Sequence, residues 1–307
     1  MKISGFTFVR NADKLYFPIK ESIESILPIV DEYIIALGKG DNEDNTEQLI
    51  LSIQSPKIKI IYRVWDEKLF KDGKIFAHET NVALNECKGD WCFYLQADEV
   101  IHENDLPILK DACQFYLHNE KVDGFTLNYY HFYGDYNHYL PIHGWCRSEI
   151  RIIRNNKNIY SYNDANSFRK ENNKKLRIIK LPAHVYHYGY VRPPDIMKQK
   201  KTIQDNIHKG FAEKQFIEDN FNYGNMKMTY LFKGSHPKVM QNRISNMSWE
   251  DKLYFKNVPL NRPKMKHEKI KYRIITFIEN KILGGRQLFG YKNWICLGSF
   301  QKKVLLI

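Results

Sequence analysis

Residues 91–100 read WCFYLQADEV, and this stretch decides the fold. Residues 91–96, which are apolar up to Leu95, predict a buried strand, and two carboxylates follow it at Asp98 and Glu99. An ionised carboxylate next to a buried strand is costly unless something binds it. A divalent metal ion that bridges a nucleotide diphosphate would do so, because Mg²⁺ and Mn²⁺ prefer oxygen ligands. The alternative for Asp98 is an ordinary turn or a helix N-cap.

The segments around this stretch alternate between strand and helix patterns. In chain order they predict strands at 3–9, 33–37, 58–64, 123–133, 149–154 and 176–188, with helices at 19–30, 46–54 and 76–87. Short alternation of this kind predicts βαβ units and a mainly parallel central sheet with flanking helices, which is an α/β fold. Ligands of such sheets bind beyond the carboxyl ends of the strands. The polar segments 10–13, 38–46 and 97–99 emerge there, so we expect them to form one site.

The composition is that of an ordinary globular protein, with 43% hydrophobic and 27% charged residues. The five cysteines include no Cys-x-x-Cys pair, which argues against a disulfide framework or a zinc site. The N-terminal MKISGFTFVRNADK has too short an apolar run for a signal peptide, and no stretch approaches the ~18 apolar residues of a membrane span. We therefore expect a cytoplasmic protein with reduced thiols.

Residues 78–100, HETNVALNECKGDWCFYLQADEV, resemble the central motif of family 2 glycosyltransferases, in which a helix bearing Arg or Asn precedes Gly-Asp-Trp, a hydrophobic strand and Asp-x-Asp-Glu. Residues 31–49, DEYIIALGKGDNEDNTEQL, resemble the strand and acidic loop of that family. The resemblance covers roughly residues 3–190. It implies a GT-A-like, Rossmann-related fold and an inverting transfer of sugar from a nucleotide-diphosphate donor to a hydroxyl of a glycan or lipid-linked acceptor. Cell-envelope polysaccharide or lipopolysaccharide synthesis is the implied setting.

The resemblance also implies a divalent metal cofactor, Mn²⁺ or Mg²⁺, at Asp98. Gln96 stands where the family has its first acidic residue, so metal binding would depend on Asp98, either alone or with help from Glu99. Enzymes of this fold often bring a histidine from a late strand to such a site, and His187 is the candidate. His184 would face the opposite side of the same strand. A hydrogen-bonded core histidine is the alternative for His187.

The nucleotide pocket is expected under the first two strands. The resemblance implies that Phe8, Arg10 and the loop 41–46 frame the base and the ribose. Asp41 or Asp44 would accept a hydrogen bond from a uracil-type imide nitrogen, so a UDP-sugar is the favoured donor, although either residue is equally well a solvated loop aspartate. The expected donor-binding residues are Phe8, Arg10, Asp41, Asp44, Gln96, Ala97, Asp98, Trp145 and Arg147.

An inverting transfer needs a base that takes the proton of the acceptor hydroxyl. Two carboxylates in the second half of the chain are candidates, Asp164 and Glu149. In the family the base follows a strand similar to residues 151–154 and a short loop, which favours Asp164. Trp145 and Arg147 lie in a nearby loop, where an aromatic face packs against a sugar and an arginine binds phosphate. The structural alternatives are surface salt-bridge partners for the carboxylates and a core position for the tryptophan.

The chain carries a net charge of +12, and residues 262–307 contain eleven Lys and Arg but only two acidic residues. From Pro193 onward the pattern becomes helical. We therefore predict a catalytic domain at 1–192 and a basic helical extension at 193–307.

Within the basic extension, one stretch has the spacing of an amphipathic helix that ends at Gly284-Gly285. The apolar positions that share a face of this helix are Ile270, Ile274, Phe277, Ile278 and Ile282. One interpretation is that this face docks on an anionic membrane surface, which would place the protein peripherally on the inner face of the cell membrane. The alternative is that it packs on the catalytic domain.

Two other function classes are weaker. A non-catalytic nucleic-acid-binding protein would explain the basic charge but not Asp98 after a buried strand or the acidic loop in the same cleft, so no nucleic-acid partner is expected. A nucleotidyltransferase would also use metal, carboxylates and a nucleotide, but the first strand lacks the usual Gly-rich, Lys-bearing loop. No Gly-x-Gly-x-x-Gly follows any expected strand, which argues against a dinucleotide site.

Overall fold

The computed structural model describes residues 1–211, 220–288, 290 and 292–301. Its strands are β1 (Ile3–Val9), β2 (Glu32–Gly38), β3 (Ile58–Arg63), β4 (Trp91–Tyr94), β5 (Glu99–Ile101), β6 (Gly124–Tyr133), β7 (His138–Tyr139), β8 (Ser148–Arg154), β9 (Ile159–Tyr162), β10 (Ser167–Lys170), β11 (Lys174–Tyr190), β12 (Tyr230–Leu231) and β13 (Trp294–Ser299). Its helices are α1 (Ile19–Ile26), α2 (Thr46–Leu51), α3 (Lys74–Asn85), α4 (Leu106–Phe115), α5 (Pro194–Lys209), α6 (Gln241–Ser245) and α7 (Ile270–Phe277). Short helical turns used below are η1 (Glu67–Leu69), η2 (Lys71–Gly73) and η8 (Ile278–Ile282).

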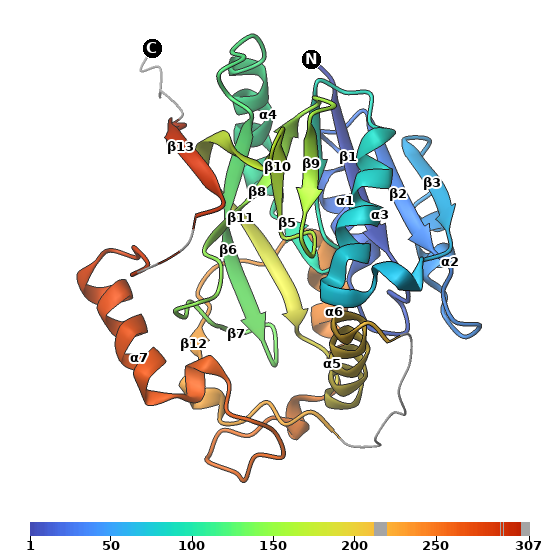
Figure 1. Ribbon diagram of the computed structural model, residues 1–307. Helices are drawn as coiled ribbons and strands as arrows, with labels where there is room; N and C mark the ends of the chain where they lie inside the picture. Colours follow the sequence, from blue (N-terminus) through green and yellow to red (C-terminus); the bar gives the residue numbers. More distant parts are fainter. Residues whose placement is uncertain (212–219, 289, 291, 302–307) are drawn as a thin grey trace.

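A large curled sheet forms the centre of the molecule, with helices on both of its faces (Figure 1). In the described residues it has 13 strands in the order β3-β2-β1-β4-β8-β6-β11-β10-β9, with β5, β7, β12 and β13 at its sides. β1 runs parallel to β2 and β4, and β2 runs parallel to β3, as expected for βαβ units. The α/β class with flanking helices is therefore confirmed.

The second half of the sheet is mixed rather than mainly parallel. β8 runs antiparallel to both β4 and β6, because β6 returns to β8 through a loop and not through a crossover helix. Parallel pairing resumes between β6 and β11 and between β11 and β13. The antiparallel β8 thus separates two groups of parallel strands.

Apolar side chains of β1 alternate between two cores on opposite faces of the sheet. Val9 packs in one cluster with Ile23 of α1, whereas Phe6 packs in another cluster with Leu84 of α3. Successive side chains of a strand point to opposite faces, so α1 and α3 cover the two faces of the sheet. This packing fixes the strands on both sides and leaves their carboxyl ends to carry the polar loops.

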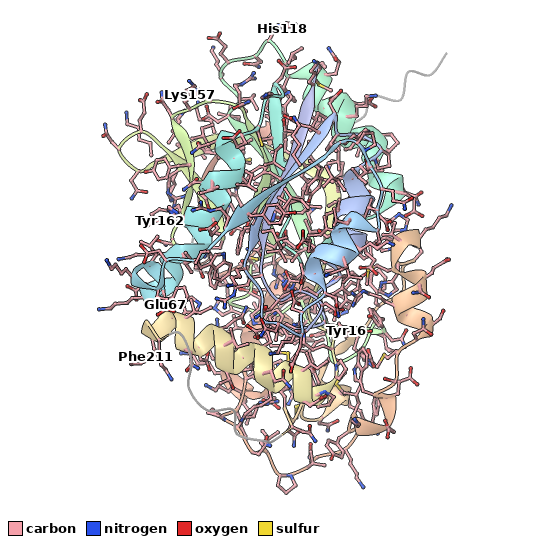
Figure 2. All side chains as sticks on the ribbon, turned by 90° about the vertical axis from the view of Figure 1, so that its right-hand side faces the viewer. Tyr16, Glu67, His118, Lys157, Tyr162 and Phe211 are labelled. Carbon is pink, nitrogen blue, oxygen red and sulfur yellow. The ribbon has the colours of Figure 1, made fainter. Side chains whose placement is uncertain are left out.

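The segment after Pro193 is more than a helical appendage. α5 begins at Pro194, and Figure 2 shows Glu67 of η1 and Phe211 on the same side of the molecule, where η2 contacts α5. β13 pairs in parallel with β11, so the C-terminal region contributes a strand to the main sheet. The division into two domains at residue 193 stays a prediction. Among the described residues, every helix is too short or too polar to span a membrane.

Candidate functional site

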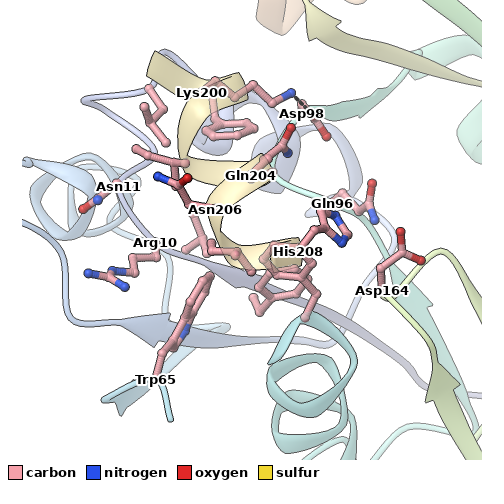
Figure 3. A pocket seen from close by; sticks show the side chains of 18 of the residues that line it. Arg10, Asn11, Trp65, Gln96, Asp98, Asp164, Lys200, Gln204, Asn206 and His208 are labelled. Atoms are coloured by element: carbon pink, nitrogen blue, oxygen red, sulfur yellow. Dashed lines mark hydrogen bonds and ion pairs between the residues drawn. The ribbon is translucent and has the colours of Figure 1, made fainter. Parts of the chain in front are cut away.

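A cavity of about 450 Å³ lies where the carboxyl ends of β1 and β4 meet α5. The loops after β1 and β4, the aromatic segment 65–76, the β9–β10 loop and one face of α5 form its walls (Figure 3). The sequence-predicted residues that line it are Phe8, Arg10, Asp41, Gln96, Ala97, Asp98 and Asp164. The carboxyl ends of neighbouring parallel strands meet at one edge of the sheet, which explains why residues so distant in sequence converge here.

The two aspartates of the acidic loop have different surroundings. The carboxylate of Asp41 lies 2.6 Å from Lys14 Nζ and 3.9 Å from Arg10 Nη2. Its hydrogen bond to Lys14 holds the pKa of Asp41 below its usual range. Asp44 lines a neighbouring cavity of about 410 Å³, which Asp41 also borders, and it accepts hydrogen bonds from the backbone N–H groups of Lys14 and Thr46. Asp41 therefore faces the main cavity, and Asp44 holds the loop in shape.

Asp98 is buried and lies beside a lysine and a histidine side chain. Its Oδ2 atom is 3.3 Å from Lys200 Nζ and 3.6 Å from His187 Nε2. Burial alone would raise the pKa of Asp98, but the neighbouring His187, Lys200 and Arg192 outweigh burial and hold it well below its usual range. Asp98 therefore stays ionised at any physiological pH.

Glu99, the next carboxylate, is committed to the core. Its two oxygens accept hydrogen bonds from Arg151 Nε and Nη2, both at 2.7 Å, and Oε1 accepts another from Tyr129 at 2.6 Å. Arg151 is itself buried, so the two charges neutralise each other inside the protein. With its oxygens bound in this way, Glu99 does not help Asp98 to bind a metal ion, which was one option that the sequence left open.

His187 is oriented by a second histidine that the sequence gave no reason to select. His131 Nε2 lies 2.6 Å from the carbonyl oxygen of Cys146 and must donate to it, while burial lowers the pKa of His131 to about 3. The neutral ring of His131 therefore has an unprotonated Nδ1, which accepts a hydrogen bond from His187 Nδ1 at 3.0 Å. This network directs Nε2 of His187 toward Asp98.

Asp98 and His187 fit a metal ion that is held jointly with a substrate. The described residues contain no group of three His, Cys, Asp or Glu side chains able to hold an ion alone. Magnesium, however, is commonly bound by one or two carboxylates together with substrate phosphates, and an imidazole ligand such as His187 suits Mn²⁺ better than Mg²⁺. Gly189 leaves room for this pair, because any side chain there would place its Cβ atom 2.5 Å from the His187 ring and 2.9 Å from Asp98 Oδ2. Gln96 adds an amide to the same cavity.

Sequence reasoning missed two further walls of the cavity. One is aromatic: Phe8 stacks on Phe76 at 5.7 Å, and Trp65 lies beneath the guanidinium of Arg10 at 5.5 Å. The other is α5, whose buried Lys200 donates to the carbonyl oxygen of Gly189 at 2.7 Å. Burial, and then the charge of Arg192, lower the pKa of Lys200 to about 7, although Asp98 partly offsets them.

Five predicted residues lie outside the lining of this cavity: Asp44 and His187, described above, and Glu149, Arg147 and Trp145. Glu149, on β8, is buried, accepts a 3.4 Å hydrogen bond from Asn293, and has its pKa raised to about 7 by burial. Arg147 is bound to Glu279 at 2.9 Å, and Trp145 packs on the ring of His131 at 5.1 Å. Glu149 was a candidate as a carboxylate, and Trp145 and Arg147 as loop residues suited to sugar and phosphate, but β8 and the loop before it place these three in contacts with the C-terminal region and the histidine pair.

Neither a protein-family model nor a curated protein matches the sequence. Similar solved structures include glucosyl-3-phosphoglycerate synthase from Mycobacterium tuberculosis in complex with Mn²⁺, uridine diphosphate and phosphoglyceric acid, at 17% identity over 42% of this chain and 43% of that chain, with a TM-score of 0.29. They also include S. aureus TarS, at 16% identity over 66% of this chain and 39% of that chain, with a TM-score of 0.39. This chain therefore spans less than half of the length of each of these two neighbours. Such values leave the activity to be inferred from the site itself.

Proposed function

We propose that this chain is a glycosyltransferase that uses a nucleotide-diphosphate sugar. The cavity described above carries the proposal, because its volume of about 450 Å³ suits a ligand of this size and its walls differ in chemistry. Figure 3 shows Trp65 and Arg10 toward one side of the cavity, and Asp98 and Asp164 toward the other. The aromatic side suits a nucleobase, and the side with charged groups suits the diphosphate and the reacting sugar.

The proposed donor is a UDP-sugar. Asp41 can accept a hydrogen bond from the imide N–H of uracil, a group that adenine and cytosine lack. At the diphosphate, Asp98 and His187 would hold Mn²⁺ or Mg²⁺, which supplies positive charge to the departing phosphates when bound. His131 keeps His187 in the ring orientation that this role needs.

Asp164 is the proposed base of an inverting reaction. Its carboxylate faces the cavity and makes no hydrogen bond or ion pair with the described residues, in contrast to the enclosed Glu149. Asp164 would take the proton of the acceptor hydroxyl while the acceptor oxygen bonds to the anomeric carbon and the bond to the diphosphate breaks. A glycan or lipid-linked acceptor, in cell-envelope polysaccharide or lipopolysaccharide synthesis, follows from the resemblance of the central motif.

A thermal-shift measurement tests the donor class. We expect UDP or a UDP-sugar to raise the Tm by several degrees, and more so with Mn²⁺ than with a chelator, because a ligand at a hundred times its Kd stabilises the folded state by ~2.7 kcal/mol. Adenosine and cytidine diphosphates serve as controls for the base, and uridine serves as the control for the phosphates. An unchanged Tm with every nucleotide diphosphate, with and without metal, would contradict the proposal.

The amphipathic helix of the extension turns its apolar side outward. Ile270, Ile274 and Phe277 of α7 are 73%, 56% and 58% exposed. The polar side faces the protein, since Thr276 accepts a hydrogen bond from the backbone of His143 and the buried Glu279 of η8 pairs with the same histidine. Of the other two residues of the predicted apolar face, Ile282 is 68% exposed and Ile278 is half-buried, so most of this face is not packed on the rest of the described chain. The exposed basic residues beside this face are Lys269, Lys271 and Arg273.

This α7 face, formed by Ile270, Ile274 and Phe277, is proposed to dock on an anionic membrane surface. Apolar side chains enter the lipid interface, and each nearby Lys or Arg contributes ~1 kcal/mol on an anionic leaflet. We expect the protein to sediment with anionic vesicles at low salt, less at high salt, and hardly at all as the Ile274→Ser/Phe277→Ser variant. Leu51→Ser, at an exposed position on α2, should bind like the unchanged protein. Failure of the unchanged protein to bind anionic vesicles at low salt would end this proposal.

A further inference from the structure

We propose that Lys200, backed by Arg192, is the protein's own binding group for the diphosphate of the donor, acting beside any metal ion held at Asp98. This inference rests on the proposed function. It assigns to α5 a part of the phosphate site that neither the central motif nor the loops of the first sheet half supply.

Lys200 is positioned at the charged side of the cavity. Its side chain is 6% exposed, and its Nζ lies 3.3 Å from Asp98 Oδ2 and 2.7 Å from the carbonyl oxygen of Gly189. An ammonium group has three N–H donors, so one remains for a ligand in the cavity that Lys200 lines. Figure 3 shows the Lys200 side chain reaching from α5 to Asp98.

Arg192 adds a second buried positive charge without enough partners. Its side chain is fully buried, and Nη1 donates to the carbonyl oxygen of Leu15 at 2.6 Å. Nε and Nη2 have no hydrogen-bond partner among the described residues. The guanidinium lies 4.5 Å from the ring centre of Phe17, and Lys200 Nζ lies 5.0 Å from the same ring, which itself lines the cavity.

The charges around Asp98 do not balance. Lys200 Nζ lies 3.3 Å from this one buried carboxylate, and Arg192 lies against the same Phe17 ring as Lys200, whereas the neighbouring carboxylate of Glu99 is paired with Arg151. Burying an unpaired positive charge is strongly unfavourable, so binding an anion at this end of the cavity would be stabilising. A diphosphate is a suitable anion, because its oxygens accept hydrogen bonds and carry more than one negative charge.

The rest of the cavity narrows the class of anion. A ligand that places an anion at Lys200 also extends along the wall formed by Phe8, Trp65 and Phe76. A nucleoside diphosphate has both a ring for this wall and phosphates for Lys200. Because Gln96 carries no charge, Asp98 is the single carboxylate for a metal ion at this site. The positive charge of Lys200 would add to that of such an ion in binding the diphosphate.

Calorimetric titration with uridine and with UDP separates the phosphate contribution from that of the base. In excess chelator, we expect the unchanged protein to bind UDP more tightly than uridine, and Lys200→Met to lose roughly tenfold or more of UDP affinity while uridine affinity is unchanged. Lys198→Met, on the same helix but outside the cavity lining, should behave like the unchanged protein. Repeating the titrations with Mn²⁺ should leave part of the Lys200→Met loss in place.

The outcomes distinguish this inference from the proposed function. If the unchanged protein binds neither UDP nor a UDP-sugar, with or without Mn²⁺, the proposed function itself fails. If it prefers UDP to uridine and Lys200→Met keeps that preference, Lys200 is not the binding group. A preference that exists only with Mn²⁺ also overturns the inference. Should Lys200→Met fail to fold, the Asp98→Asn/Lys200→Met variant removes both charges of the buried pair and must show the same loss in chelator.

Discussion

Replacing Asp98 with Asn should lower the rate of sugar transfer roughly a thousandfold while the protein keeps its fold. The amide has the shape of the carboxylate but lacks the charge that would hold a divalent ion between Asp98 and His187. Steady-state transfer from a UDP-sugar, measured with the Tm of each variant, gives the result. Excess chelator should inactivate the unchanged protein to a similar degree.

The matched control for Asp98→Asn is Asp66→Asn. Asp66 is exposed and accepts a hydrogen bond from the backbone of Lys68 at the start of η1, a task that asparagine also performs. This control should retain full activity. Full activity in Asp98→Asn, or in the unchanged protein with excess chelator, would remove Asp98 and its metal from the mechanism.

Asp164→Asn should reduce kcat by about a hundredfold or more and leave the affinity for the donor nearly unchanged. The carboxylate lies on the cavity wall, held there by a tight loop in which Asn163 and Ala165 have φ values of 54° and 63°. An amide keeps the loop and the donor contacts but cannot accept the proton of the acceptor hydroxyl. Single-turnover kinetics together with calorimetric titration of UDP separate the two effects.

Glu149→Gln is the comparison for Asp164→Asn, because Glu149 was the other carboxylate considered for the base. Its enclosed position predicts near-normal turnover in the variant. Normal transfer by Asp164→Asn would show that another group takes the proton, and a large loss in Glu149→Gln would mean that the region around β8 opens during the reaction.

Local sequence patterns were sufficient to predict much of the first sheet half and its polar edge. The alternation of apolar strands and amphipathic helices predicted β1 to β4, and Asp98 stood out because a charge directly follows a buried strand. Arg10 and Asp41 followed from the rule that polar loops at the carboxyl ends of parallel strands meet. These are short-range signals, and the cavity brings all of them together.

The remaining walls depend on packing between distant segments, which a single sequence does not reveal. Lys200 occurs in a lysine-rich helix where nothing marks it as the buried one, and Trp65 lies in an irregular segment. For Glu149 the sequence pointed to a catalytic role that its position does not favour. As an acidic residue it was a candidate base, but the pairing of β8 with β6 buries it. For α7 the helical period was readable, but the direction of its apolar side was not.

β13 acts as a cover for the backbone of β11. Residues Trp294–Ser299 pair with Leu176–Lys180 along one side of that long strand. A chain cut before residue 294 would leave those N–H and C=O groups without partners, and an uncovered strand edge is a template for pairing with another molecule. Such a chain would tend to self-associate and to sediment by itself. Membrane docking is for this reason better studied with point variants of α7. A deletion of the C-terminal region would cause self-association that sedimentation cannot separate from vesicle binding.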